Sequence, residues 1–487
     1  MSDSQSTRSF YMMDSRVVDS SEGVRLDVCQ PAKAGPVLSQ QTPWESHYMT
    51  PHSLVHFDGE YLLYYLVYIV NDGPHRMATC LATSRDGLFW ERPELGQVEY
   101  ASSKANNIIA VSNTVTVAVD PIAPAERRFL MTGTDSRTKP DAPGYVKESL
   151  ALHTSPDGRV WTQASPALCG FSCDSTNQIL YDSAKGKYVA YLRAFPGRRA
   201  VAYYEPPSLF EPWPISPAES NKGEVHATID SQHRSIYIVD EMPIAIDGSD
   251  THQVYNPGVV PMQGLYLAFP HIFRIFPGPQ HPDATRFSDS ELYEYWNDGM
   301  VAPRLYVSED GISFRPIGES PYIDLGLGND LDTRQVRMVP EMIDRGDEIW
   351  QYYGGQQTGH RLALADGIRP RKKSAVMRAV QRRDGFVGME ASCGSGNVVT
   401  TPVKCTGENL CVNYDAGAWG EVRVELLGGD GSPVHGYSLS DGATLVGNEV
   451  YGQVQWADRR DMGPLVGREV RVRFCLETAK VFSFKFE

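Results

Sequence analysis

The sequence has little of what marks several large classes of protein. It contains eight cysteines in 487 residues, too few for a disulfide scaffold, and spacings such as Cys169 to Cys173 match no zinc-binding signature. No apolar run approaches the roughly 18 residues of a membrane-spanning helix, and the first residues lack the apolar stretch of a secretory signal. These absences predict a cytoplasmic protein with reduced cysteines and no membrane partner.

Basic residues and familiar cofactor motifs are also scarce. Lys and Arg number 45 against 60 Asp and Glu, a net charge of −15, which repels nucleic-acid backbones and anionic membranes. No Gly-rich phosphate loop, His-Glu-x-x-His helix or Gly-x-Ser-x-Gly elbow occurs, which disfavours nucleotide-binding, zinc-protease and serine-hydrolase functions. We therefore expect no nucleic-acid partner, no metal site and no organic cofactor.

Residues of turns and strands are abundant. The chain has 43 Gly, 33 Pro, 25 Tyr and 17 Phe, which is typical of many short strands and tight turns. The phrase Ser-x-Asp-Gly, followed by an aromatic residue, begins at Ser84, Ser155 and Ser308, and a looser copy ends in Asp384-Gly385. Asp-Gly between apolar runs indicates a turn, because glycine supplies the positive φ that the turn needs.

The spacing of these turns predicts a repeated unit. Their aspartates are separated by 71, 153 and 74 residues (86 to 157, 157 to 310 and 310 to 384). The intervals suggest a unit of roughly 70 to 77 residues in five copies, one of them degenerate and near position 230. The alternative is a chance recurrence of a common dipeptide.

Each unit reads as four antiparallel strands, which is the make-up of a propeller blade. We therefore predict an all-β fold: a five-bladed β-propeller over residues 40–391, preceded by an N-terminal extension, 1–39, that packs on it. After a Gly/Ser-rich linker, short alternating strands such as Val422–Leu426 predict a β-sandwich over residues 392–487. Its expected role is to brace the propeller. The sequence leaves both a monomer and a homo-oligomer open.

Acidic residues recur where such blades would open onto one face. Near the starts of predicted first strands lie Glu45, Asp174 and Asp250, and in loops after predicted second strands lie Asp72 and Asp298. Two carboxyl groups facing each other across an axial pocket are what glycoside cleavage requires, since one protonates the departing oxygen while the other attacks or activates water. The alternative for each residue is a cap of a turn or strand.

Basic and aromatic residues occupy the same predicted regions. Those expected to contact substrate are Arg193, His271, Arg274, Arg334 and Trp44. Planar guanidinium groups suit anionic or polyhydroxylated ligands, and an indole can stack on a sugar ring. The alternatives are ion pairing with the surplus acids for the arginines and simple packing for the tryptophan.

Two stretches carry a family resemblance. Tyr61–Tyr65, followed by Ala82-Thr83-Ser84-Arg85-Asp86-Gly87-Leu88-Phe89-Trp90-Glu91, resembles the first blade of the five-bladed propeller glycosidases, the superfamily that contains glycoside hydrolase families 32, 43, 62, 68 and 130. The opening Tyr11–Arg16 and Pro43-Trp44-Glu45 resembles a group of bacterial proteins related to family 32. The resemblance implies a glycoside hydrolase that cleaves a furanoside or related linkage of an oligosaccharide or glycoside.

The resemblance also implies Asp174 and Asp250 as the axial carboxylates. The sequence departs from the families elsewhere: the family 32 Trp-Met-Asn-Asp-Pro-Asn-Gly, Arg-Asp-Pro and Glu-Cys boxes are absent, and Thr50-Pro51 stands where family 43 has Asp-Pro. Two alternatives therefore stay open, a non-catalytic carbohydrate-binding propeller and a family 130-like glycoside phosphorylase, in which basic residues would hold phosphate.

Overall fold

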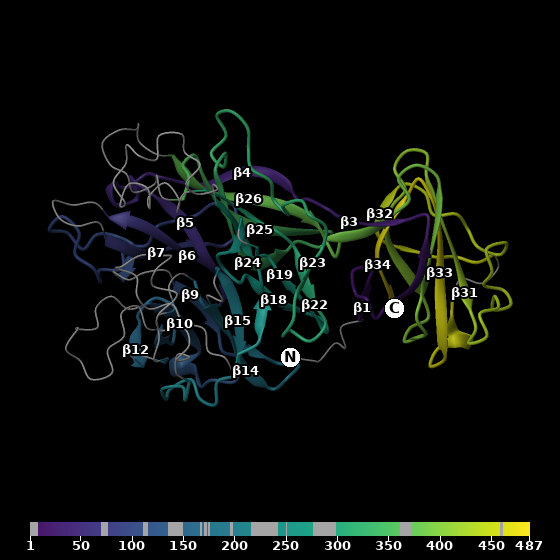
Figure 1. The fold of residues 1–487 in the computed structure, drawn as a ribbon, viewed down its shortest axis with the longest axis horizontal. Coiled ribbons are helices and arrows are strands. Elements are labelled where there is room, and N and C mark those ends of the chain that lie inside the picture. The colour runs from purple at the N-terminus through teal and green to yellow at the C-terminus, as the bar shows by residue number, and fades with distance from the viewer. Residues whose placement is uncertain are drawn as a thin grey trace.

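The computed structural model describes most of the chain: residues 8–69, 76–110, 115–134, 150–165, 168–169, 173, 176–194, 198–215, 242–249, 251–275, 299–360, 373–457 and 461–487. These residues are all-β, with short 3-10 helices at Pro43–Glu45 (η1), Ala125–Arg127 (η2) and Gly463–Leu465 (η5). No helix among them is long and apolar enough to cross a membrane. Figure 1 shows a large lobe, residues 32–382, beside a small lobe, residues 387–487 with 9–28.

Among the described residues, the large lobe contains five antiparallel sets of four strands. The first two are β5 (Met49–Phe57), β6 (Glu60–Ile69), β7 (Arg76–Ser84), β8 (Ile108–Ala110), and β9 (Val115–Val119), β10 (Phe129–Thr134), β11 (Leu150–Ser155), β12 (Thr162–Ser165). The third and fourth are β13 (Gln178–Asp182), β14 (Lys187–Ala194), β15 (Ala200–Tyr204), β16 (Ile244–Ile246), and β18 (Val259–Met262), β19 (Leu265–Ala268), β22 (Tyr306–Ser308), β23 (Arg315–Pro316). The fifth is β24 (Gln335–Asp344), β25 (Glu348–Gln356), β26 (Ser374–Arg382) and β4 (Ala32–Ser39).

The fifth set belongs to a larger sheet. At β24 it is extended by β21 (Gly299–Pro303), β20 (His271–Ile275) and β17 (His252–Val254). Val301 of β21 pairs with Gln335 of β24 in parallel. The hairpin of β20 and β21 lies in the chain between β19 and β22, so the fourth and fifth sets are tied together near the beginning of β24.

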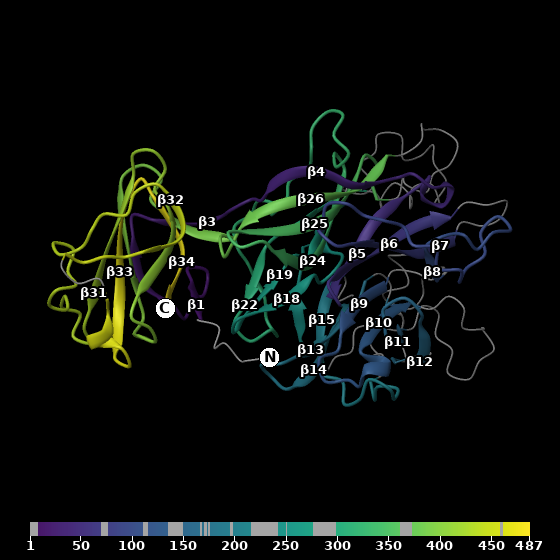
Figure 2. The ribbon, with the colours of Figure 1, turned by 180° about the vertical axis from the view of Figure 1, so that it is seen from behind.

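The five first strands lie beside one another in the order β5, β9, β13, β18 and β24, and β24 returns to β5. Side chains join neighbours: Ser53 Oγ of β5 accepts from the backbone N–H of Val117 on β9 at 2.9 Å, and the Gln178 amide of β13 bonds both backbone groups of Val259 on β18. Separate apolar cores fill the space between successive sheets. Figure 2 shows the first sheet, β5 to β8, on the side of the large lobe that faces away from the small lobe.

The Ser-x-Asp-Gly phrases form the corner after the third strand of their sheets. In the first, Asp86 Oδ1 accepts from the backbone N–H groups of Leu88 and Phe89 at 2.8 and 3.0 Å, and Ser84 Oγ accepts from Gly87 at 2.9 Å. The corners at Ser155 and Ser308 repeat these bonds. The glycines have φ values of +77°, +72° and +70°, which explains why glycine recurs there.

A tyrosine of the preceding sheet closes each of these corners. Its hydroxyl donates to the glycine carbonyl: Tyr352 to Gly87 at 2.6 Å, Tyr64 to Gly158 at 2.8 Å and Tyr191 to Gly311 at 2.8 Å. All three tyrosines lie on the second strand of their sheets, β25, β6 and β14. The repeated phrase therefore builds a contact between neighbouring sheets as well as a turn.

The predicted degenerate copy near position 230 lies outside the described residues. The third strand of the third sheet is β15, which ends at Tyr204, so the corner that follows a third strand begins at Glu205 in this sheet. The turns are unevenly spaced because the connections between strands differ in length, and only the local corner chemistry repeats.

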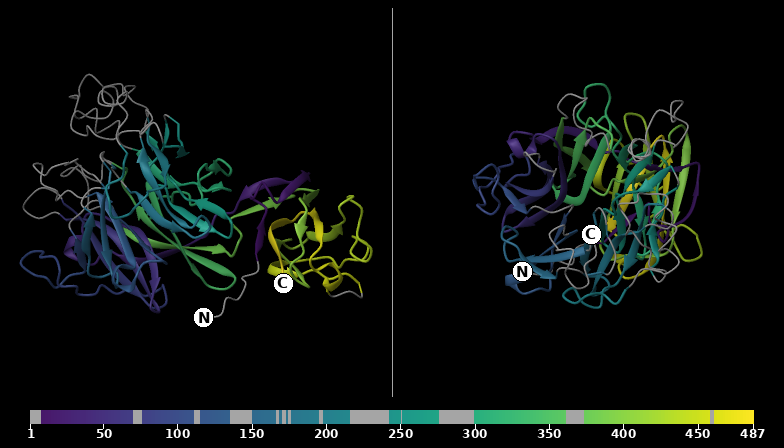
Figure 3. Two further views of the ribbon diagram at one scale, coloured as in Figure 1. Left: turned by 90° about the horizontal axis from the view of Figure 1, so that it is seen from below. Right: turned by 60° about the vertical axis from the view of Figure 1, so that its left-hand side comes forward.

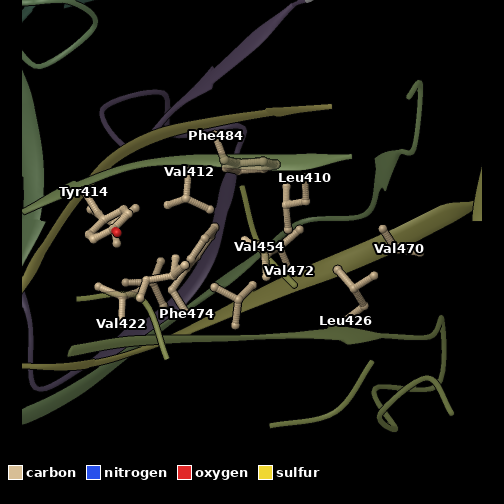
Figure 4. Close-up of a cluster of buried hydrophobic side chains, with 14 of the residues drawn as sticks. Leu410, Val412, Tyr414, Val422, Leu426, Val454, Val470, Val472, Phe474 and Phe484 are labelled. Carbon is tan, nitrogen blue, oxygen red and sulfur yellow. The ribbon is translucent and has the colours of Figure 1, made fainter. Parts of the chain in front are cut away.

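The small lobe consists of two sheets around one apolar core, in which Val412 and Phe484 of one sheet approach Val472 and Phe474 of the other (Figure 4). The first sheet orders β3 (Arg25–Val28), β27 (Val387–Glu390), β34 (Lys480–Phe486), β30 (Leu410–Asp415) and β32 (Asn448–Gln453), with β1 (Ser9–Tyr11) also on β34. The second orders β2 (Val18–Glu22), β28 (Ser395–Thr400), β33 (Glu469–Glu477) and β29 (Val403–Lys404), with β31 (Glu421–Leu427) also on β33.

The N-terminal residues join both lobes. β1 and β2 pair with small-lobe strands, β3 pairs with β27, and β4 pairs with β26 as the outer strand of the fifth set. Figure 3 shows the extended strands that connect the lobes. The N-terminal segment, expected to pack on the large lobe as an extension, thus supplies strands to the sheets of both lobes.

Candidate functional site

A cavity lies where the five first strands meet. Its lining is Thr50, Pro51 and His52 of β5, Thr116, Val117 and Ala118 of β9, Thr176, Gln178 and Ile179 at β13, Asn256, Pro257 and Gly258 before β18, His271 of β20, and Arg337, Met338, Pro340 and Glu341 of β24. The space within it that is open to a water molecule is about 40 Å³. Residues far apart in the chain therefore meet at one point, which we call the axial cavity.

Arg337 is the cation of the axial cavity. Its side chain is 8% exposed, and its Nε and Nη2 both donate to Gln335 Oε1, at 3.1 and 2.9 Å. The guanidinium lies 4.8 Å from the ring centroid of Tyr255, whose hydroxyl is 3.0 Å from His360 Nε2. No carboxylate of the described chain forms an ion pair with Arg337, so its charge is balanced there only by aromatic and amide groups.

Two neutral histidines flank Arg337. Burial, reinforced by the positive charge of Arg337, lowers the pKa of His52 to about 4 and that of His271 to about 3. The backbone N–H of Met338 donates to His271 Nε2 at 2.8 Å. The same Nε2 lies 2.9 Å from the Met338 carbonyl oxygen, and Nδ1 has no hydrogen-bond partner among the described residues.

Glu341 supplies a carboxyl group deeper in the axial cavity. It lies where the pairing of β24 with β25 shifts between Met338 and Met342, a bulge that contains Pro340, and proline in a sheet is found at such bulges. Glu341 Oε2 accepts from the backbone N–H of Leu54 at 3.2 Å. Burial raises the pKa of Glu341 to about 8, so this carboxyl is mostly protonated at neutral pH.

Of the predicted substrate contacts, His271 lines the axial cavity and Arg193 lies close by. Arg193 Nη1 donates to the backbone carbonyls of Val254 and Tyr255 at 3.3 and 2.7 Å, and its guanidinium is 4.9 Å from the Tyr255 ring centroid. Arg193 therefore fixes the segment that leads into the lining residue Asn256. Four predicted carboxylates, Asp72, Asp174, Asp250 and Asp298, lie outside the described residues.

Glu45 and Trp44 do not line the axial cavity. Glu45 is fully buried at the end of η1, where its carboxylate accepts from the Tyr65 hydroxyl at 2.7 Å, from Arg92 Nε at 2.8 Å and from the Gln41 and Thr42 backbone. Trp44 Nε1 donates to Asn107 Oδ1 at 3.0 Å. The capping arrangement of η1 directs both side chains into the packing of the first sheet, which is a structural role.

Arg274 and Arg334 also lie elsewhere than the axial cavity. Arg274 lines a separate pocket of about 610 Å³, next to β17, β20 and β21, with His252 and Arg304. Arg334 is exposed just before β24. The strand that follows Asp250 is β17, at the edge of its sheet, whereas the first strand of the fourth sheet is β18; the expected position of Asp250 before a first strand is wrong, and its catalytic role stays a prediction.

Arg337, Glu341 and His52 were not among the residues predicted from the sequence. A signal was available, because Gln335, Arg337 and Glu341 interrupt a predicted first strand that is otherwise apolar. Their direction, however, depends on which face of β24 points to the axis and on the bulge at Pro340. Within the described residues no group of three His, Cys, Asp or Glu side chains is arranged to hold a metal ion.

No family model and no curated protein matches the sequence. Solved structures resemble the chain: a glycosyl hydrolase from Bacteroides ovatus, 16% identical, TM-score 0.40, covers 78% of this chain and 94% of its own. A glycoside hydrolase family 43 arabinoxylan arabinofuranohydrolase from Bacillus subtilis is 11% identical, with a TM-score of 0.38; the match covers 93% of this chain and 99% of the other. An N-acetylgalactosamine deacetylase from F. plautii is 12% identical, with a TM-score of 0.42; the match covers 74% of this chain and 96% of the other. At these identities the likeness concerns the fold.

Proposed function

We propose that the chain is a glycoside hydrolase that cleaves a furanoside or a related sugar linkage at the mouth of the axial cavity. In this proposal the five sets of strands are the blades of a five-bladed β-propeller and the small lobe is an accessory β-sandwich. The ring of first strands, the apolar cores between successive sheets and the closure of the last sheet by β4 support that architecture. Such an arrangement gathers distant residues around one axis.

One observation carries the proposal: the axial cavity holds polar groups that lack partners. The hydroxyls of Thr50 and Thr176 and Nδ1 of His271 are buried without a hydrogen-bond partner among the described residues, next to the charged Arg337. Buried polar groups are normally paired, and leaving one unpaired costs about 1–3 kcal/mol. A ligand rich in hydroxyl groups and other oxygen atoms would supply the missing partners, which is what a sugar offers.

For the catalytic pair we propose Asp174 and Asp298, with Asp298 in place of Asp250, because Asp250 precedes the edge strand β17 and not a first strand. Asp174 is two residues before Thr176, whose hydroxyl lines the axial cavity. Asp298 precedes Gly299, whose carbonyl accepts from the backbone N–H of His360 at 3.1 Å, and His360 contacts Tyr255 beside Arg337. One carboxyl would protonate the leaving oxygen and the other would attack the sugar or activate water. Glu341 lies deeper than the strand starts and has no proton-transfer role in this scheme.

Leaving-group dependence separates the two roles. Wild type, Asp174→Asn and Asp298→Asn are assayed on aryl furanosides with a good leaving group and on oligosaccharides with a poor one. The variant that lacks the acid should lose about 10²–10⁴-fold on oligosaccharides but far less on the aryl substrate, because a good leaving group needs no proton. The variant that lacks the nucleophile or base should lose activity on both.

Asp58→Asn is the matched control, since Asp58 occupies a turn with φ of +52° at the opposite end of the first sheet and asparagine tolerates that conformation. It should keep full activity. Turnover that requires inorganic phosphate would select the phosphorylase alternative. Sugar binding by a wild type that cleaves no glycoside would contradict the proposal and favour a binding protein.

A further inference from the structure

Arg337 keeps hydrogen-bond capacity that the described protein does not use. A guanidinium has five N–H donors. Two of those of Arg337, on Nε and Nη2, donate to Gln335 Oε1. Of the other three, on Nη1 and Nη2, at least one is engaged with the Tyr255 side chain, and the hydrogen bonds of the described residues give the rest no further acceptor, although Arg337 is only 8% exposed. A buried cation is normally paired because removing it from water is costly.

The described lining of the axial cavity carries a single positive charge. Arg337 contributes it, because no other lysine or arginine stands among the described residues that line the cavity. His52 and His271 are neutral at pH 7, since their pKa values are lowered to about 4 and about 3. Glu341, with a pKa raised to about 8, is mostly uncharged. The cavity is therefore matched to one negative charge.

The size of the axial cavity limits what can enter it. About 40 Å³ is open to a water molecule, and one water needs about 10–15 Å³ by this measure. The space takes a few waters or a group of two oxygens on one carbon, and it does not take a sugar ring. A ring at the mouth could direct a substituent of that size into the cavity.

We propose that the axial cavity binds the carboxylate of an acidic sugar, so that the substrate class is a uronic-acid-containing glycoside. The carboxylate pairs with the N–H donors of Arg337 that the described residues leave unused, and the hydroxyls of Thr50 and Thr176 are the neighbouring donors. The proposal rests on the function proposed above and deepens it, because it names the part of the substrate that the cavity recognises.

A carboxylate fits the axial cavity better than phosphate does. The planar guanidinium matches a carboxylate with two parallel hydrogen bonds, and a carboxylate brings the single charge that the lining balances. Inorganic phosphate at pH 7 is partly a dianion, which would leave a second charge buried among neutral side chains. One binding assay that compares uronates with inorganic phosphate therefore also tests the phosphorylase alternative.

The test measures binding, without turnover. Isothermal titration of the full chain compares D-glucuronate and D-galacturonate with D-glucose, D-galactose, inorganic sulfate and inorganic phosphate. The acidic sugars should bind about 10- to 100-fold more tightly than the neutral sugars, the range expected of a charge-assisted hydrogen bond. Their affinity should fall as NaCl rises, whereas the affinity of the neutral sugars should stay constant.

Arg337→Met should abolish the preference for acidic sugars, and Arg337→Lys should keep part of it. The control is Arg378→Gln, on β26 of the same sheet, where Arg378 stacks 4.1 Å from the Trp350 ring centroid outside the axial cavity; it should keep the full preference. If Arg337→Met does not fold, the proposal is still tested by two measurements: the NaCl dependence of the affinity of wild type for acidic sugars, and the preference of Arg337→Lys for them.

Equal binding of acidic and neutral sugars by wild type would overturn the proposal, as would phosphate binding more tightly than either uronate. Selective binding of uronates by a chain that cleaves no glycoside would support the recognition proposed here and contradict the hydrolase. Hydrolysis of neutral furanosides with no preference for acidic ones would support the hydrolase and contradict the recognition of a carboxylate. The two proposals can therefore fail separately.

Discussion

The corners of the sheets and the axial cavity differ in how their polar groups are hydrogen-bonded. At the corners, the Asp86 carboxylate and the Ser84 hydroxyl take up the backbone N–H groups of the turn, and Tyr352 of the neighbouring sheet binds the remaining carbonyl. In the axial cavity, by contrast, Thr50, Thr176 and His271 have buried polar atoms that find no partner in the described part of the chain. The backbone groups of the corner turns are paired within the protein, whereas a ligand would pair the polar atoms of the axial cavity in the function proposed above.

The repetition of sequence follows the same division. The corner phrase recurs because each copy solves the same local problem, a turn with positive φ next to a neighbouring sheet. The cavity residues come from five different strands and share no phrase. We infer that repeated residues hold this fold together and that unrepeated polar residues on the axis serve its function. Substitutions at paired groups should therefore cost stability, and substitutions at unpaired groups should cost binding.

The largest expected effect on stability is that of Glu45→Ala. The change leaves the Arg92 guanidinium, the Tyr65 hydroxyl and two backbone N–H groups buried without their acceptor. Removing one partner of a buried ion pair costs about 3–5 kcal/mol, and urea unfolding should show a loss of that size. A variant as stable as wild type would show that Glu45 does not hold η1 against the first sheet.

Gly87→Ala should have the next largest effect. Gly87 has φ of +77°, and a Cβ there would lie 2.7 Å from the Tyr352 hydroxyl, so the substitution strains the backbone and displaces the bond between sheets. We expect a loss of about 2–4 kcal/mol in the free energy of unfolding. The matched control is Gly59→Ala, with φ of +76° and no atom within 4 Å, which should cost about 1 kcal/mol. Equal losses in the two variants would mean that the tyrosine contact contributes nothing.

These two positions also show what the sequence could predict. The corner at Gly87 was predictable, because the hydrogen bonds of its turn lie within the six consecutive residues from Ser84 to Phe89. Glu45 was expected on the axis because it precedes the first strand, but the cap that η1 forms with Thr42 turns it into the packing. Position in the chain was a good guide to the turn and a poor guide to the direction of a side chain.

The axial cavity was largely beyond prediction for a related reason. Arg337 and Glu341 stand in a first strand whose inward face is set by contacts with β5 and by the bulge at Pro340, and both depend on residues far away in the sequence. Of the predicted contacts, His271 lines the axial cavity. An all-β fold follows from local patterns, whereas the charge of a cavity follows from which faces the closed ring turns inward.

Glu341 should make the stability of wild type depend on pH. Between the ordinary pKa of 4.5 and the raised value of about 8, the folded chain holds a proton that the unfolded chain releases. The free energy of unfolding therefore falls as pH rises through that window. We expect wild type to lose about 2 kcal/mol relative to Glu341→Gln between pH 5 and 8, less than the full shift implies because the side chain is only partly buried. Parallel pH profiles of the two proteins, measured by urea unfolding, would contradict the raised pKa.

The smallest effect should come from Tyr64→Phe, which tests a single hydrogen bond at a corner of the sheets. The change removes the donor to the Gly158 carbonyl, 2.8 Å away, and keeps the ring in its core. A lost hydrogen bond of this kind costs about 1 kcal/mol. The control is Tyr181→Phe, whose ring packs edge-on against Tyr188 on the third sheet at a centroid distance of 5.3 Å, and its cost should be smaller. Because the tyrosine binds at the corner and not in the axial cavity, Tyr64→Phe should leave the affinity for acidic sugars unchanged; a change in that affinity would show that the corners and the axial cavity are coupled.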